Sequence, residues 1–278
     1  QRLALDLFAS QGSLVEFRHR FLPVQNEVNP AWFHHYWSDI LLNGKKNFVA
    51  EGFRESAKTS LVIKGPPLHA LAYPREERNY IVFLLSNATI AQKRLEEIVQ
   101  AYETNKDLSG NLIRSVAYKP SLGFYEVVVT DGEKEIPIRI EAYGKGASIR
   151  GLSWNDRRPS LVIIDDPQDL DDVTSDLIVD RDWDWFLSEV KFLGKDARIF
   201  LIGNNLGEKC IVERCIANSE LLGFDAMRVP VADENFLKSN WPERFPLDFV
   251  LEEKSTYEQL GKSDIWWRER MCVALSPT

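Results

Sequence analysis

Cysteine and long apolar runs are both scarce in this sequence, and their scarcity excludes several kinds of protein. The three cysteines, Cys210, Cys215 and Cys272, are too few and too unevenly spaced for a disulfide scaffold or a four-ligand zinc site. We expect reduced thiols in a cytoplasmic protein. The longest apolar runs, such as residues 80–85, are far shorter than the ~20 residues that span a bilayer. We therefore expect neither a signal peptide nor a transmembrane helix.

The sequence also lacks an excess of basic residues. Its 34 Lys and Arg stand against 42 Asp and Glu, which gives a net charge of −8. This balance excludes a histone-like or polybasic nucleic-acid binder, so any contact with nucleic acid needs a local basic surface or several copies of the chain. With 44% hydrophobic and 27% charged residues, the 278-residue chain is typical of one large globular domain, or of a core with a smaller appendage.

Short β-rich apolar runs alternate with helical stretches along the chain. Four such runs predict strands buried on both faces, at residues 47–50, 80–86, 160–164 and 197–202. Two more, at 124–130 and 136–142, are joined by a loop that opens with Asp131 and Gly132, a strong hairpin signal. The pattern predicts an α/β fold with a mainly parallel sheet and an attached antiparallel hairpin.

Helical periodicity surrounds these strands and dominates the last fifth of the chain. The predicted helices cover residues 32–42, 89–104, 182–193, 208–217, 247–260 and 264–274. From about Asp225 onward, prolines and aromatic residues replace the alternating pattern. We therefore expect a core domain over residues 1–224, which includes an N-terminal helical segment, and a small helical subdomain over residues 225–278.

A phosphate-binding motif follows the first predicted strand. Its residues are Gly52, Phe53, Arg54, Glu55, Ser56, Ala57, Lys58 and Thr59. They fit the pattern G-x-x-x-x-G-K-[ST], except that Ala57 replaces the second glycine. Such a loop surrounds a polyphosphate with backbone N–H groups, while Lys58 reaches the outer phosphates and the Thr59 hydroxyl holds Mg²⁺. The alternative is a chance match in a strand-to-helix loop.

Two carboxylates, Asp165 and Asp166, end the strand predicted at 160–164. Ligands of doubly wound sheets bind at the carboxyl ends of strands, where Asp165 is placed to hold Mg²⁺. Asp166 occupies the position at which such ATPases usually have Glu, and it would orient the attacking water. Because Asp169, Asp171 and Asp172 follow, an acidic loop without chemistry is the alternative.

Two amides, Asn204 and Asn205, follow Gly203 after the last predicted strand. An amide at that strand end can bind the γ-phosphate or the water and report hydrolysis to the rest of the chain. A simple turn is the alternative, since Gly and Asn both favour turns.

The ordered set of motifs resembles one family, the large subunit of the tailed-bacteriophage terminase. The matching segments are residues 30–37 before the phosphate loop, Arg54 four residues before Lys58, and the stretches 85–92, 146–151, 165–167, 241–245 and 266–270. The resemblance covers nearly the whole chain. It implies an ASCE-type ATPase that uses ATP and Mg²⁺ to thread double-stranded viral DNA into a prohead.

The resemblance also implies partners, a location and site residues. The expected partners are viral double-stranded DNA, the portal protein, the small terminase subunit and further copies of the chain in a ring, in the cytoplasm of the infected host and outside the mature virion. Arg54 would contact the phosphates of its own subunit, and Arg150 would reach the site of a neighbour, with Arg157 and Arg158 as alternatives. Phe33 and His34 would lie near the nucleotide base.

Full-length members of that family also carry a C-terminal RNase H-like nuclease domain, and nothing follows Thr278 here. The resemblance therefore implies the ATPase half, without DNA cleavage. Two other functions remain open at this point. A superfamily-2-like helicase shares the core but needs a second RecA-like domain. A non-catalytic DNA- or portal-docking module would explain Ala57 and Asp166 as signs of lost hydrolysis.

Overall fold

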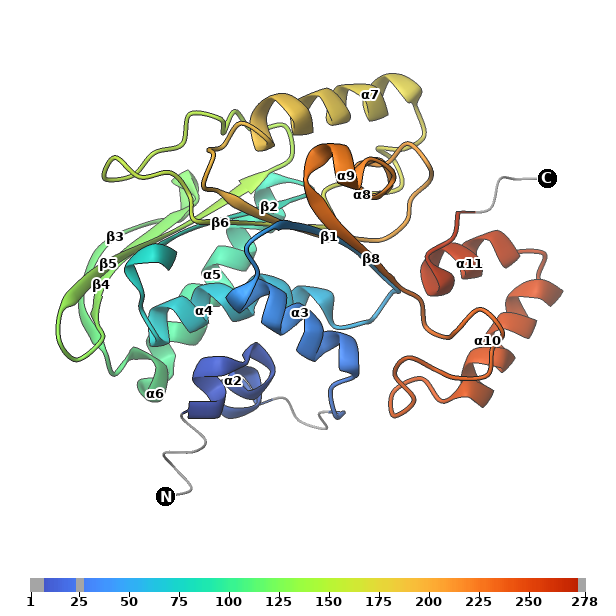
Figure 1. Cartoon of the computed structure of the whole chain (residues 1–278), viewed down its shortest axis with the longest axis horizontal. Coiled ribbons are helices and arrows are strands. Elements are labelled where there is room, and N and C mark those ends of the chain that lie inside the picture. The colour runs from blue at the N-terminus through green and yellow to red at the C-terminus, as the bar shows by residue number, and fades with distance from the viewer. Residues whose placement is uncertain (1–7, 24–27, 275–278) are drawn as a thin grey trace.

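An eight-stranded sheet runs through the middle of the molecule (Figure 1). The computed structural model describes residues 8–23 and 28–274. The strands are β1 (Asn47–Gly52), β2 (Tyr80–Leu85), β3 (Leu112–Lys119), β4 (Phe124–Thr130), β5 (Glu135–Gly144), β6 (Leu161–Asp165), β7 (Arg198–Gly203) and β8 (Phe224–Val229). Their order is β3-β4-β5-β2-β6-β7-β1-β8. The pairs from β5 to β8 are parallel, whereas β3–β4 and β4–β5 are antiparallel. The predicted α/β fold with a mainly parallel sheet and an attached hairpin is confirmed.

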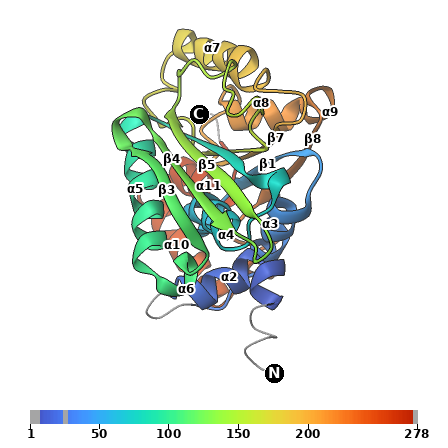
Figure 2. The same ribbon diagram turned by 90° about the vertical axis from the view of Figure 1, so that its left-hand side faces the viewer.

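Burial explains which strands the sequence predicted and which it missed. Every residue of β2 and β6 is buried, because helices cover both faces of the sheet there, and such strands read as continuous apolar runs. The outer strand β3 is exposed along most of its length and so lacks that signal (Figure 2). The opposite edge strand β8 was also missed, because Asp225 and Arg228 interrupt its apolar residues.

Helices cover both faces of the sheet (Figure 1). On one face lie α2 (Leu14–Phe21), α3 (Trp32–Asn43), α4 (Gly65–Ala72), α5 (Ala88–Thr104) and α6 (Lys106–Ser109). On the other face lie α7 (Asp176–Trp185), α8 (Ile211–Ala217) and α9 (Ser219–Leu222). Beyond the β8 edge follow α10 (Leu247–Gln259) and α11 (Ser263–Met271). Among the helices of the described residues, none is both long and apolar enough to cross a membrane.

Helix boundaries differ from the expected ones where a side chain has a tertiary role. The helix expected at 182–193 is α7, which begins six residues earlier and continues as the π-helical turn η4 (Phe186–Val190). The helix begins at Asp176 after the extended backbone of Ser175, and Asp182 lies within it, where its buried carboxylate accepts a hydrogen bond from Lys145 Nζ at 2.7 Å. By contrast, α5 begins where expected, since the Asn87 side chain caps it by accepting from the Ile90 N–H at 2.9 Å.

The segment expected to be a helical subdomain packs on the phosphate loop. The boundary expected between residues 224 and 225 falls at the start of β8, so the helical part of this segment follows the last strand. Trp241 contacts His34 with ring centroids 4.6 Å apart, and Phe245 contacts Phe53 at 5.3 Å. The aromatic side chains of the tail therefore join the hydrophobic core beneath α3 and the loop that precedes Lys58.

Candidate active site

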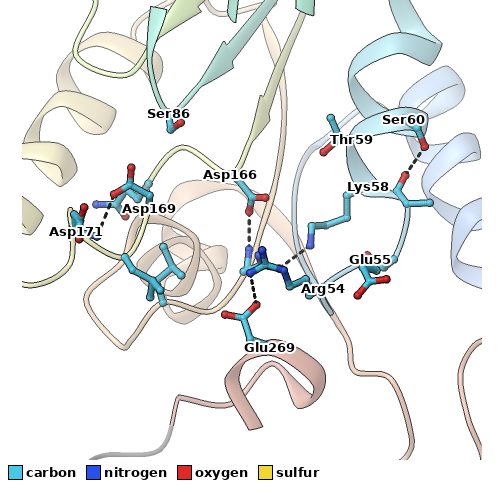
Figure 3. A pocket seen from close by; sticks show the side chains of 16 residues that line it. Arg54, Glu55, Lys58, Thr59, Ser60, Ser86, Asp166, Asp169, Asp171 and Glu269 are labelled. Carbon is cyan, nitrogen blue, oxygen red and sulfur yellow. Dashed lines mark hydrogen bonds and ion pairs between the residues drawn. The ribbon is translucent and has the colours of Figure 1, made fainter. Parts of the chain in front are cut away.

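A cavity of about 760 Å³ lies at the carboxyl ends of β1, β6 and β7 (Figure 3). The strand order places β7 between β1 and β6, so residues that follow three separate strands meet there. Its walls include Arg54, Glu55, Ser56, Ala57, Lys58, Thr59, Ser60, Asp166, Gln168, Asp169, Asp171, Asn204 and Glu269. Most of the residues predicted for nucleotide binding thus surround one space.

The phosphate loop is held closed around the ammonium group of Lys58. Lys58 is 6% exposed and Nζ donates to the backbone oxygens of Gly52 at 2.9 Å and Phe53 at 3.3 Å, and to Asn204 Oδ1 at 2.7 Å. A side chain on Gly52 would lie 3.0 Å from both the Lys58 side chain and Ser56 Oγ, which explains the glycine there. The three acceptors hold the positively charged ammonium of Lys58 in position near the carboxyl ends of the strands. The motif predicts a lysine in this position.

Ala57, the departure from the motif, carries backbone strain. Its φ is 60°, in the left-handed region that a glycine occupies without cost, and Glu55 two residues earlier has φ 69°. The loop therefore keeps the backbone shape that the missing glycine would allow, although an alanine occupies the position.

We expect Ala57→Gly to stabilise the fold. Removing Cβ relieves about 1–2 kcal/mol of left-handed strain, partly offset by the greater freedom of glycine in the unfolded chain, for a net gain of about 0.5–1 kcal/mol. The measurement is chemical denaturation of both proteins. Ala101→Gly inside α5 is the matched control, and it should lose a similar amount. Equal losses at both positions would show that the φ of Ala57 carries no strain.

Thr59 and Asp165 form the contact at which a divalent cation would bind. Thr59 Oγ1 donates to Asp165 Oδ2 at 2.7 Å, and Asp165 is 2% exposed at the end of β6. Its other oxygen, Oδ1, is buried and has no hydrogen-bond partner among the described residues. Burial, together with the neighbouring Asp166, raises the pKa of Asp165 to about 7. A carboxylate oxygen and a hydroxyl beside a phosphate loop are suitable Mg²⁺ ligands.

Asp166 lies beside this contact in an unusual backbone conformation. Its φ is 42°, and its N–H donates to the Ile202 carbonyl at 3.0 Å, which aligns the end of β6 with β7. Its Oδ1 accepts from the Asn204 N–H at 3.0 Å (Figure 3). Within the described part of the chain Oδ2 accepts no hydrogen bond. The side chain is held in the cavity wall with one oxygen available to a water.

The two amides after β7 have different surroundings. Asn204 lies between Lys58 and Asp166, contacting the first through its side chain and the second through its N–H. Asn205 is buried, and its Nδ2 donates to Glu213 Oε1 and to the Cys272 carbonyl, both at 3.1 Å. Asn204 therefore faces the candidate nucleotide site, and Asn205 joins the same turn to the end of α11.

Arg54 lies at the mouth of the cavity, attached to the C-terminal helix. Its backbone N–H donates to the Glu269 carbonyl at 2.7 Å, and its Nη1 lies 3.4 Å from Glu269 Oε2. Arg270 donates to the Arg54 carbonyl at 2.8 Å and is itself held by Glu253, 2.8 Å from its Nε. The Arg54 side chain is otherwise 65% exposed and lines the cavity. The tail thus fixes the backbone of the phosphate loop.

Phe33, His34 and Arg150 do not line the cavity. Phe33 is fully buried, and His34 accepts from the Ala31 N–H at 2.8 Å while its Nε2 donates to the Ser56 carbonyl at 2.8 Å. Burial lowers the pKa of His34 to about 4, so its ring is neutral and supports the loop from behind. Arg150 is 68% exposed on a separate surface, with Nε 3.9 Å from Glu189 Oε1. The roles predicted for these three residues stay predictions.

A pair of acidic residues, the buried Glu51 and the partly buried Glu213, lies behind the phosphate loop and was not found from sequence. Glu51, next to Gly52 in β1, is fully buried, and Arg228 Nε donates to its Oε2 at 3.0 Å. Arg228 also contacts Glu213 Oε1 at 2.6 Å. Burial and the nearby Glu213 raise the pKa of Glu51 to about 9, so Glu51 is protonated at neutral pH.

Because the pKa of Glu51 is higher in the folded chain than in the unfolded one, its contribution to stability is complete at acidic pH and is lost as pH rises through 9. Glu51→Gln keeps a neutral side chain and removes this titration. We expect the stability of the variant relative to the parent to rise as the pH increases from about 4.5 to about 9, the interval between the unfolded and folded pKa values of Glu51. Denaturation at several pH values measures it, and a constant difference would contradict the assignment.

Sequence reasoning also missed the residues that reach the cavity from other elements. Glu269 comes from α11, and Gln168 from the loop after β6, where its side chain donates to Asp182 and accepts from the Ile211 N–H. Gln168 lies outside the matching segments, and Glu269 lies in the stretch 266–270, for which no site role was predicted, so only the folded chain reveals that they belong to the wall. Among the described residues, no group of three His, Cys, Asp or Glu forms a metal cluster.

The same fold occurs in solved structures of phage terminases. The ATPase domain of the large terminase of Thermus phage P74-26 matches with a TM-score of 0.52 at 12% identity, over 90% of this chain and 100% of that one. A mutant of that domain gives 0.55 at 12% identity, over 90% and 95%. The large terminase of bacteriophage HK97 gives 0.54 at 14% identity. That match covers 94% of this chain and 54% of the HK97 protein, so this chain spans about half its length.

Comparisons by sequence found no match, either to a protein-family model or to a curated protein. At 12–14% identity the structural similarity establishes the fold. The chain has the fold of the large-terminase ATPase domains, as the sequence resemblance implied.

Proposed function

We propose that this chain is the ATPase part of a viral DNA-packaging motor. The observation that carries the proposal is the contact between Thr59, which lines the cavity together with Lys58, and the buried Asp165, in a fold shared with large-terminase ATPase domains. The reaction is hydrolysis of ATP to ADP and phosphate, which would drive translocation of double-stranded DNA.

The chain offers a suitable place for Mg²⁺. Thr59 Oγ1 and Asp165 would hold it, and the buried Oδ1 of Asp165 without a partner is the feature that such a cation would satisfy. When bound, Mg²⁺ neutralises charge on the phosphates and stabilises the transferred phosphoryl group. A nearby cation would also lower the pKa of Asp165 and keep this carboxylate ionised.

The remaining side chains would act on the nucleotide and the water. Phosphate oxygens would compete with the loop carbonyls for the Lys58 ammonium, which places a positive charge where negative charge develops. Asp166 would orient the attacking water through its Oδ2, while the Asn204 N–H holds its Oδ1. Arg54 would exchange Glu269 for a phosphate, because this exposed ion pair is weak.

At the level of the motor, the proposal includes the partners that the resemblance implies. The chain would act as a homo-oligomeric ring on the portal protein with the small terminase subunit, in the host cytoplasm during virion assembly. Because the net charge is −8, contact with DNA would come from cationic residues repeated around the ring. These contacts would bind phosphates without reading sequence.

The test is the rate of ATP hydrolysis per chain, measured over a range of protein concentrations with Mg²⁺ or with a chelator. We expect Mg²⁺-dependent turnover that rises with concentration, because a ring site needs a neighbour. Duplex unwinding and plasmid nicking are measured on the same samples, and neither is expected.

Two outcomes would replace the proposal. Nucleotide binding without turnover at any concentration would indicate the non-catalytic docking module. Strand separation would indicate a helicase, although the described residues form a single sheet and hold no second RecA-like core.

A further inference from the structure

A second cavity, of about 410 Å³, lies at the amino-terminal ends of the central strands, opposite the candidate nucleotide site at their carboxyl ends. It is bordered by the amino-terminal ends of β6 and β7, by the C-terminal end of α3 and by α4. The cationic residues in its wall come from three separate elements. They are Lys45 after α3, Arg78 in the short helix η2 (Glu76–Arg78), and Arg198 at the start of β7.

Arg78 is a half-buried cation without an ion-pair partner among the described residues. Its side chain makes no hydrogen bond or ion pair with them, although its backbone N–H caps a turn at the Arg75 carbonyl. Burial and the nearby Arg75 lower its pKa by more than the nearby Glu77 raises it. A cation in such surroundings is costly unless an anion accompanies it.

Arg198 is fixed in place beside the same cavity. Its guanidinium donates to the Ile40 and Leu41 carbonyls at the C-terminal end of α3. A side chain on Gly44 would lie 2.5 Å from the Ile40 carbonyl and 2.9 Å from Arg198 Nη1, so glycine is what permits this approach. A guanidinium has five N–H donors, and these two contacts leave others for a ligand.

The carboxylates of this wall lie in solvent and do not pair with the arginines. Glu77 and Asp196 are exposed, and neither forms an ion pair with the described residues, although Glu77 is close enough to raise the pKa of Arg78. His69 is neutral, since burial lowers its pKa to about 4, and its Nε2 is bonded to the Gln11 carbonyl at 2.9 Å. The wall of the cavity therefore has cationic donors that no carboxylate of the described residues binds directly.

We propose that this cavity binds a small phosphate-bearing anion through Arg78, Arg198 and Lys45. Donors from three different elements suit a tetrahedral anion with several oxygens better than a planar carboxylate, which one arginine can hold alone. A concave site of this size admits a free phosphate compound and excludes the convex backbone of a DNA duplex. It is separate from the nucleotide cavity, with which it shares no residue.

Calorimetric titration with pyrophosphate tests the proposal in chains that carry Lys58→Ala, which weakens binding at the phosphate loop. We expect this variant to retain one binding event and the added Arg78→Gln to weaken that event at least about tenfold, because a charged hydrogen bond is worth about 1.5–3 kcal/mol. Lys93→Gln, which removes an exposed charge on α5, is the matched control and should leave the affinity unchanged.

Melting temperatures show that the variant is folded. Without anion, Arg78→Gln should melt at or above the parent, since it removes an uncompensated charge, and pyrophosphate should no longer raise its melting temperature. Equal affinity with and without Arg78, or no binding once Lys58 is replaced, would overturn the proposal. Equal protection by acetate would also overturn it, because the ligand would then be a carboxylate.

Discussion

Lys58→Ala is expected to reduce ATP turnover by about 10²–10³-fold, the usual cost of removing one preorganised group that stabilises transition-state charge. The ammonium of Lys58 is the cation that the folded chain centres in the phosphate loop, with three acceptors within 3.3 Å. Without it, the loop would offer only its backbone N–H groups and the Arg54 side chain to the phosphates. Steady-state hydrolysis at saturating ATP and Mg²⁺ measures the effect.

Lys64→Ala is the matched control for Lys58→Ala. Lys64 lies one turn further along, pairs with Glu97 at 2.7 Å and does not line the cavity. It should keep nearly the full rate. Because Lys58 is buried, its loss also leaves the Gly52 carbonyl and Asn204 Oδ1 without a donor, at a cost of about 1–3 kcal/mol. A melting curve separates this loss from the loss of activity, and a folded variant with normal turnover would remove Lys58 from the site.

The parts of the fold that the sequence predicted are those in which local pattern and tertiary environment agree. Strands β2 and β6 are covered on both faces and are apolar throughout, so their burial can be read from sequence. Strand β3 is ordered by pairing with β4, and its exposed side chains give no periodic signal. The start of α7 was misplaced because Asp182, expected to begin the helix, lies inside it and is bonded to Lys145, 37 residues away along the chain.

The residues of the candidate site also fall into those that the sequence predicts and those that only the folded chain reveals. Asp166 and Asn204 directly follow parallel strands and Lys58 lies in the loop after another, and the sheet brings these strand ends together. Glu269 reaches the cavity only because the tail folds back onto Arg54, a contact between residues 215 positions apart. His34, predicted to lie near the nucleotide base, donates to the Ser56 carbonyl, and its role at the base stays a prediction.

The contacts of the two amides after β7 suggest how the site and the tail could communicate. Asn204 contacts Lys58 and Asp166, whereas Asn205 contacts Glu213 and the Cys272 carbonyl at the end of α11. A ligand that displaces Lys58 from Asn204 would therefore act on a turn that is bonded to the C-terminal helix. The role of this turn as a nucleotide sensor follows from the proposed function and is tested with it.

Arg150→Ala is expected to reduce turnover by about 10³–10⁵-fold, the range measured for arginines supplied to a neighbouring site. Arg150 does not line the cavity of its own chain, and its side chain is 68% exposed, which leaves it accessible to another subunit. Arg158, one of the alternatives, donates to the Arg150 and Leu152 carbonyls and supports this loop. Arg157 Nη1 lies 3.4 Å from the Glu76 carbonyl.

Mixing two inactive variants distinguishes an arginine supplied by a neighbour from one that acts within its own chain. In a mixed ring, an Arg150→Ala chain supplies an intact Lys58 to one site, and an adjacent Lys58→Ala chain supplies the missing arginine. We expect hydrolysis to reappear on mixing, with a maximum near equal amounts, because only interfaces between unlike chains in one order are complete. A mixture as inactive as its parts would exclude Arg150 as the shared residue, and the same experiment with Arg157→Ala and Arg158→Ala would then identify which arginine crosses the interface.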